Sequence, residues 1–176
     1  MAIRTLITIA IISPFLLAGC APADPPSPPT ITASADPVDA LDPCALITED
    51  EALAHQVVPD EIEPSDDRER VCSWVDAASG SDLQIVTAVV VGWGVDDEVA
   101  VGADLVEETT IGTHEAAVLA ITDNRDWCRV VFPVTLSEEM QLRSLVAVEA
   151  IRWEGDACPD AMTFAELVEP RVPAGG

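Results

Sequence analysis

The spacing of apolar and polar residues divides the chain into segments of different character. Residues 1–20 carry one early base, Arg4, and then an apolar run that closes in Leu17-Ala18-Gly19-Cys20. A run of about a dozen apolar residues is too short to span a bilayer core of about 30 Å, and small residues before a cysteine are typical of a lipoprotein signal peptide. We therefore expect residues 1–19 to be a signal peptide and Cys20 to be lipidated.

Residues 20–41 follow another pattern, with six prolines and several Ser and Thr residues. This composition favours an extended polyproline II chain over a packed element. Two or more acyl chains on Cys20 suffice for stable anchoring without a spanning helix. The sequence thus predicts a lipidated, Pro-rich tether on the outer face of the cytoplasmic membrane. It also predicts a single extracytoplasmic domain at residues 42–173 and a tail at residues 174–176.

Two stretches of the domain carry helix signals. In the first, Thr48 can cap the helix and Glu51 completes a capping box, and the pattern ends near Val58-Pro59. In the second, Pro159 suits a first helical turn. The apolar residues after it recur at i, i+3, i+4 and i+7, namely Ala161, Phe164, Ala165 and Val168. We expect an N-terminal and a C-terminal helix.

Runs rich in β-branched residues predict strands between these helices, at residues 71–75, 83–93, 116–121, 127–134 and 144–153. Turn-like segments at residues 77–82 and 122–126 predict two hairpins. Residues 83–93 are apolar on both faces, as in a central strand, whereas Pro133 indicates an edge or a strand end. Residues 94–105 stay ambiguous. The order of elements predicts an α+β domain with a mostly antiparallel sheet of about five to six strands, packed by both helices.

Composition narrows the function classes. The 176 residues are 49% apolar, enough to fill the core of one domain. Acidic side chains number 32 against 8 basic ones, all of them Arg, and the formal net charge is -24. Such a charge repels phosphate backbones, so we expect no nucleic-acid partner.

Four cysteines remain after Cys20, namely Cys44, Cys72, Cys128 and Cys158. In an oxidising compartment an even number favours two disulfides. Three connectivities are open, and we favour Cys72 with Cys128, which both lie in strand patterns, and Cys44 with Cys158, which each lie at the foot of a predicted helix. A zinc site is the weaker alternative, because no C-x-x-C pair is present.

No catalytic constellation accompanies these features. Nucleophilic or general-base catalysis needs a base oriented by a third group beside the reacting atom, and neither His55 nor His114 has a recognisable partner of this kind in the sequence. We therefore expect no catalytic residue, no resident metal and no cofactor. Calcium binding by acidic loops at residues 60–67, 96–98 and 123–126 is an alternative, although none has EF-hand spacing.

Two tryptophans end apolar strand patterns and mark a candidate ligand cleft. Trp93 and Trp153 each follow such a run, and large aromatic side chains there either pack at the rim of a core or line a pocket. We place the candidate cleft between the sheet and a covering helix, near both residues.

Five short motifs resemble those of a family of small actinobacterial envelope lipoproteins known only as a domain of unknown function. They are Asp42-Pro43-Cys44-Ala45-Leu46, Cys72-Ser73-Trp74, Ile111-Gly112 with Ala116, Trp127-Cys128-Arg129-Val130, and Asp156-Ala157-Cys158-Pro159 with Ala161. The resemblance covers about residues 42–173. It implies a lipidated extracytoplasmic module with two disulfides and brings no catalytic residues with it.

The sequence therefore favours a non-enzymatic binding or accessory module of the cell envelope. We expect the lipid on Cys20 to attach the module to the membrane. We also expect the folded domain to bind an envelope protein or a small apolar ligand. The alternatives are a calcium-responsive module and an envelope hydrolase with an unrecognised site.

Overall fold

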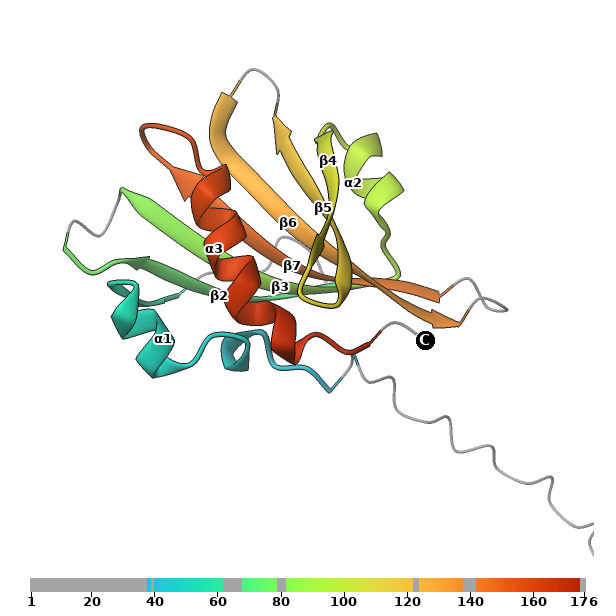
Figure 1. Ribbon diagram of the computed structural model, residues 1–176, viewed down its shortest axis with the longest axis horizontal. Coiled ribbons are helices and arrows are strands. Elements are labelled where there is room, and N and C mark those ends of the chain that lie inside the picture. Colours follow the sequence, from blue (N-terminus) through green and yellow to red (C-terminus); the bar gives the residue numbers. More distant parts are fainter. Residues whose placement is uncertain are drawn as a thin grey trace, which may run out of the picture. The chain divides into compact units, whose positions relative to one another are not determined.

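Figure 1 shows the chain as a computed structural model, which describes Val38 and residues 40–61, 68–78, 82–121, 124–137 and 142–174. The predicted signal peptide, Cys20 and nearly all of the predicted tether lie outside these residues. Their assignment therefore stays a prediction from the sequence.

Seven strands form one antiparallel sheet in the order β1-β2-β3-β7-β6-β5-β4. The strands are β1 (Val57–Asp60), β2 (Glu69–Asp76), β3 (Leu83–Val91), β4 (Asp104–Ile111), β5 (His114–Ile121), β6 (Asn124–Ser137) and β7 (Leu142–Arg152). The central position belongs to β7, which pairs with β3 on one side and β6 on the other. The last long strand of the chain is thus inserted between two earlier hairpins.

One face of the sheet is covered by α1 (Glu49–Ala54), α3 (Cys158–Val168) and the first of two short 3-10 helices, η1 (Pro43–Ala45) and η2 (Glu169–Arg171). Strand residues such as Ile85 and Phe132 are buried in one core with Phe164 and Val168 of α3. The predicted capping box forms at α1, where Thr48 and Glu51 bond reciprocally. Pro159 lies in the first turn of α3, and the four predicted apolar positions are buried. Both expected helices are confirmed.

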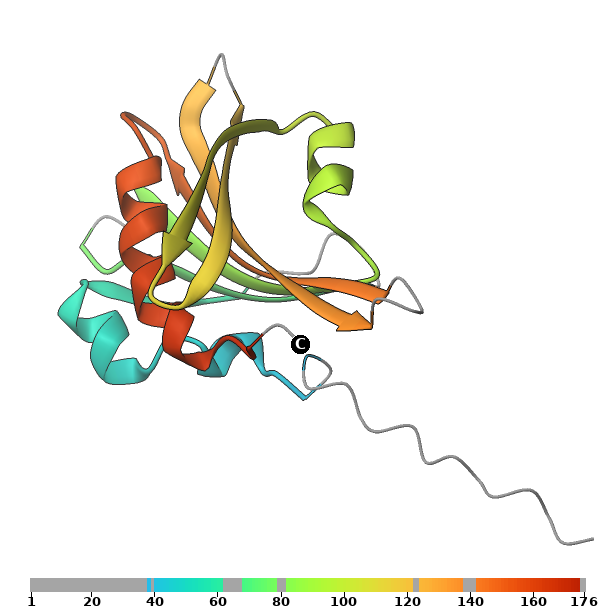
Figure 2. The same cartoon turned by 45° about the vertical axis from the view of Figure 1, so that its right-hand side comes forward.

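The opposite face of the sheet carries a second, smaller core. Ala88, Leu119 and Val131 are buried there, and Trp93 and Val95 pack against them from the β3–β4 connection, which contains α2 (Val95–Ala100). Figure 2 shows the strongly curved sheet with α2 set apart from α3. Because both faces are covered around its centre, β3 is buried at nearly every position, as its two-sided apolar pattern predicts.

The sheet has more strands than the five to six expected. β1 is a four-residue strand directly after the first helix, and β4 carries mostly exposed, polar residues. Neither has the apolar alternation that marks a half-buried strand. Pro133 also differs from expectation, because β6 is an interior strand that continues to Ser137. The paired residues of β5 and β6 end at Ala117 and Val131, so Pro133 lies beyond the segment where β5 needs an amide donor.

Two disulfides are present, but their pairing differs from the favoured one. Cys44 bonds to Cys72, and Cys128 bonds to Cys158. The expectation of Cys72 with Cys128 is wrong because β3 and β7 separate β2 from β6 in the sheet. Three strand spacings amount to roughly 14 Å, whereas disulfide-bonded Cα atoms lie about 5–6 Å apart. Each Cys of the sheet therefore bonds to a short helix packed on its own strand.

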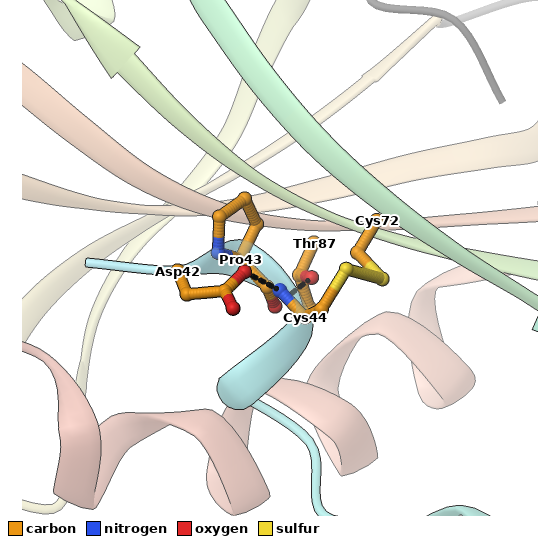
Figure 3. The surroundings of a disulfide bond; sticks show 5 residues. All are labelled: Asp42, Pro43, Cys44, Cys72 and Thr87. Atoms are coloured by element: carbon orange, nitrogen blue, oxygen red, sulfur yellow. Dashed lines mark hydrogen bonds between the residues drawn. A yellow bond between two sulfur atoms is a disulfide. The ribbon is translucent and has the colours of Figure 1, made fainter.

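The Cys44–Cys72 bond fixes η1 to β2 (Figure 3). Asp42 caps η1 by accepting a hydrogen bond from the Cys44 amide at 2.9 Å. The buried hydroxyl of Thr87 donates to the Pro43 carbonyl at 2.7 Å. The disulfide and the hydrogen bond together hold the beginning of the folded body on the sheet.

The end of the predicted tether is part of this packing. Val38 is fully buried, and the Arg70 guanidinium donates to the carbonyls of Val38 and Leu41 at 2.8 and 2.6 Å. Within the described residues, no helix is both long enough and apolar enough to cross a membrane.

Candidate ligand-binding cleft

A cleft of about 620 Å³ is lined by residues of α2 and of the β4–β5 hairpin. Figure 2 shows α2 and this hairpin facing each other, with α3 on the far side of the hairpin. The lining of the cleft comes from α2 (Val95, Asp96, Val99), β4 (Leu105, Glu108, Thr109, Thr110), β5 (Glu115, Ala116, Ala117) and β6 (Pro133). Small-molecule sites in proteins commonly have volumes of about 300–1,000 Å³. The cleft therefore has the size of a ligand site.

The strand register explains why the cleft lies there. Glu115, Ala116 and Ala117 of β5 all line the cleft, and the ladder between β5 and β6 ends at Ala117. Beyond this point the hairpin diverges from β6, and Pro133 offers no amide hydrogen to continue the pairing. The position of Pro133 and the end of the β5–β6 ladder at Ala117 therefore determine where the cleft opens.

Apolar side chains are exposed along the cleft. Val99 is 43% exposed and Leu105 44% exposed, and both line it, while Val101 and Val106 are exposed close by in the chain. Four of the seven exposed large hydrophobic residues in the described part of the chain thus fall within residues 99–106. Clustered exposed apolar surface is typical of a binding site, whereas scattered single residues are not.

The polar groups of the cleft are all acidic or uncharged. Asp96, Glu108 and Glu115 contribute carboxylates, and Thr109 and Thr110 contribute hydroxyls. An ion pair joins Asp96 to Arg143 at 3.4 Å, but both side chains are largely in solvent. Among the described residues no Arg lines the cleft, and the carboxylates give it a negative electrostatic potential.

A buried charge cluster lies where α2 meets the sheet. The Arg129 guanidinium is 3.1 Å from Glu69, 3.5 Å from Glu98 of α2 and 3.5 Å from Glu149. Burial raises the pKa of Glu98 and of Glu149 against the opposing effect of Arg129, and the neighbouring carboxylates raise both further. Arg129 is thus the shared cationic partner of three carboxylates. Its ion pair with Glu98 connects α2 to the sheet.

His114 has an oriented imidazole but no catalytic surroundings. Its Nδ1 is 2.7 Å from Glu169 of η2, which also accepts from the Thr113 amide at 2.8 Å. Its Nε2 is buried and has no hydrogen-bond partner among the described residues, and its ring meets Phe132 edge to face. A general base must reach the proton that it abstracts, and this nitrogen faces the core. His55 instead packs against Phe164.

The two tryptophans expected to share one cleft are not brought together. Trp93 follows β3 and Trp153 follows β7, and these strands run antiparallel with Leu83 opposite Arg152. The two rings therefore lie at opposite ends of the pair, separated by the length of a nine-residue strand, roughly 30 Å. Trp93 packs against the smaller core with the Arg68 guanidinium 4.5 Å from its ring, and Trp153 is 65% exposed.

A second opening of about 390 Å³ lies beside the Cys44–Cys72 disulfide. Its lining is mostly apolar and includes Leu53 and Trp74. Among the residues that the structure describes, no group of three or more His, Cys, Asp or Glu side chains could hold a metal ion. Large parts of the acidic loops at residues 60–67 and 123–126 lie outside the described residues.

Sequence reasoning missed the residues of the larger cleft. They fall mainly in the ambiguous region and in β4, whose exposed residues give no core pattern. The sequence does contain one indication of the cleft. The valines and the leucine at residues 99–106 fit no helix or strand pattern and lie within an otherwise acidic stretch. An apolar residue that no periodic pattern buries is a candidate for a binding surface.

Fold and cleft together define an α+β domain with two disulfides and a ligand-sized cleft on the sheet face away from its main core. The chain belongs to the family described as "Protein of unknown function (DUF3558)", whose model matches residues 15–171. This match confirms the expected membership of a family of unknown function. Searches of curated proteins and of solved structures found no match.

Proposed function

We propose that the protein is a lipid-anchored extracytoplasmic binding module that takes a small ligand with an apolar body in the cleft between α2 and the β4–β5 hairpin. The observation that carries this proposal is the concentration of exposed apolar side chains at a cleft of about 620 Å³. An apolar lining with a few polar groups is the usual form of a small-molecule site.

The rest of the molecule supports binding over catalysis. Two disulfides and a double-sided core make the sheet a rigid support for the cleft. The carboxylates and hydroxyls of the lining stand beside apolar side chains, an arrangement that suits the head and the body of an amphipathic ligand. The sequence supports the proposed location of the module, since a lipid on Cys20 and a Pro-rich tether would hold it outside the membrane.

The test uses the full chain in nanodiscs of neutral phosphatidylcholine, with empty nanodiscs as the blank for partitioning. Equilibrium dialysis measures saturable binding of radiolabelled 1-hexanol, a short uncharged apolar probe. We expect saturable binding that Leu105→Ser weakens severalfold, because the substitution removes apolar surface from the lining.

Ile121→Ser is the matched control. Ile121 is 45% exposed, against 44% for Leu105, but it lies outside the lining of the cleft. It should leave binding unchanged. Absence of saturable binding, or equal losses in both variants, would show that the cleft is not the ligand site.

A further inference from the structure

The charges of the cleft specify what kind of ligand fits it. We propose that its ligand is a monovalent organic cation, an ammonium or guanidinium group carried on an apolar tail. This inference rests on the proposed function and names the chemical class of ligand for the same cleft.

The register of the β4–β5 hairpin brings two glutamates close together. Glu108 pairs with Ala117 and Thr110 pairs with Glu115, so the two glutamates are diagonal neighbours on one face of the hairpin. Diagonal neighbours across antiparallel strands are about 7–8 Å apart, within reach of long side chains. Both carboxylates therefore line the cleft close enough to approach one small cation, with the Thr110 hydroxyl beside them.

Neither glutamate has a cationic partner among the residues that the structure describes. No ion pair or hydrogen bond involves Glu108 or Glu115 within the described part of the chain. The two side chains are diagonal like charges, and like charges on adjacent strands are destabilising. A bound cation would relieve this repulsion, so the two carboxylates are complementary to a positive group.

The apolar part of the lining decides between a metal ion and an organic cation. Val95 and Val99 of α2 and Leu105 of β4 give this space apolar surface. The one carboxylate that α2 contributes, Asp96, is 91% exposed and already paired with Arg143. Calcium prefers six to eight oxygens, whereas an alkylammonium ion needs a few acceptors at its head and apolar contact along its tail. The lining provides the acceptors of Glu108, Thr110 and Glu115 on the hairpin, and apolar surface on both α2 and β4.

The negative charge of the chain and of the cleft lining disfavours anionic ligands. The chain carries a formal net charge of -24, and the part of the cleft lining that the structure describes has three carboxylates and no Arg. Fields of this sign raise the local concentration of cations and lower that of anions. A fatty acid or a phosphate ester therefore meets repulsion at the position where an amine finds two acceptors.

The test compares three probes that share one tail, hexylammonium, 1-hexanol and hexanoate, by equilibrium dialysis against the full chain in the neutral nanodiscs. We expect hexylammonium to bind about tenfold more tightly than hexanol at low salt, since charge-assisted hydrogen bonds are about twice as strong as neutral ones. Hexanoate should not bind. Added monovalent salt should weaken the hexylammonium complex and leave the hexanol complex unchanged.

The charge-removing variant is Glu108→Gln/Glu115→Gln, and its control is Glu107→Gln. Glu107 is exposed on the same strand but pairs with Val118, whose side chain belongs to the core on the opposite face. The double variant should abolish the preference for hexylammonium, and the control should retain it. Hexanol binding reports whether either variant has damaged the cleft.

The outcomes separate the two proposals. Hexanol binding that depends on Leu105, without any preference for hexylammonium, overturns the cation inference and leaves the proposed function intact. Failure of all three probes overturns both. Displacement of hexylammonium by calcium at micromolar concentration would also overturn the inference, because it would assign the carboxylates to a metal ion.

Discussion

At the scale of single residues, Arg129 is the least ordinary feature of the molecule. Its side chain is 11% exposed and is surrounded by three carboxylates, one from each of β2, α2 and β7. Ionisation of all three would leave the cluster two negative charges in excess, and buried excess charge is costly. The cluster therefore favours a bound proton, which agrees with the raised pKa of Glu98 and Glu149.

The excess negative charge around Arg129 predicts how the free energy of unfolding depends on pH. A carboxyl whose pKa is higher in the folded than in the unfolded state binds its proton more tightly when folded. Its stabilising contribution is therefore complete below the ordinary pKa of 4.5 and is lost as the pH rises through the raised pKa. Glu149→Gln should reduce this loss and stabilise the protein by about 1 kcal/mol at neutral pH. Urea unfolding between pH 4.5 and 7.5 measures the effect.

Arg129→Met provides the contrast, because it removes the single cation. It should destabilise the protein by about 3–5 kcal/mol at neutral pH, and by less at acidic pH, where the carboxyls accept protons. Glu107→Gln, on an exposed site, should change neither the stability nor its pH dependence. Equal pH profiles for the wild-type protein and Glu149→Gln would show that the cluster is not the titrating group.

Gly112, in the turn between β4 and β5, predicts a second effect at the residue scale. Its φ is +57°, and a Cβ atom there would lie 2.3 Å from the Glu169 carboxyl carbon. Gly92 has a similar φ of +72° with open space around it. Gly92→Ala should cost about 1 kcal/mol from backbone strain alone. Gly112→Ala should cost about 2 kcal/mol more, since the contacts of Glu169 must also break. Thermal unfolding of both variants checks the difference.

At the scale of elements, Glu169 joins the β4–β5 hairpin to the end of α3. Hydrogen bonds from the Thr113 amide and from His114 lower the pKa of Glu169. Its contribution to stability is therefore present above the ordinary pKa and is lost as the pH falls through the lowered one. The hairpin forms one wall of the cleft, so this contact also positions Glu108 and Glu115.

Glu169→Ala should free the hairpin turn. We expect faster hydrogen exchange of the Thr113 amide, which loses its acceptor, and a small fall in melting temperature. Glu166→Ala, at an exposed position of α3, is the control and should leave this exchange unchanged. Unaltered protection of Thr113 in Glu169→Ala would mean that the turn is held by other contacts.

Elements with a local signal could be predicted from the sequence, and those without one could not. The capping box at Thr48 and the apolar period after Pro159 depend on residues a few positions apart, and both helices form as expected. α2 is six residues long with Gly94 as its N-cap, and a helix of this length rarely carries a full apolar period. β4 is exposed along most of its length because it is an edge strand beside a cleft.

At the scale of the whole molecule, the insertion of β7 between β3 and β6 decides most of what the sequence left open. Both hairpins were predictable, because their strands are joined by short turns. The order in which hairpins associate depends on contacts far apart in the chain, and no local pattern encodes it. The mistaken disulfide pairing and the separation of Trp93 from Trp153 both follow from this one topological fact.

The positions of the arginines make the disulfide pairing directly testable. Cleavage after each Arg of the unreduced protein places Cys128 in the peptide 126–129 and Cys158 in the peptide 153–171, while Cys44 and Cys72 fall in peptides ending at Arg68 and Arg125. Mass spectrometry should find peptide 126–129 linked to peptide 153–171. A link between peptide 126–129 and the peptide that contains Cys72 would contradict the structure.

The two bonds should also differ in how readily they are reduced. They close loops of nearly equal length, with sequence separations of 28 and 30, so each should contribute about 3.5 kcal/mol in the chain-entropy model. Their burial is unequal, because Cys128 is fully buried whereas Cys44 is exposed. Thiol–disulfide exchange requires access of the attacking thiolate to a sulfur atom. Mild reduction followed by alkylation should therefore label Cys44 and Cys72 first, and earlier labelling of Cys128 would show that α3 leaves the sheet before η1 does.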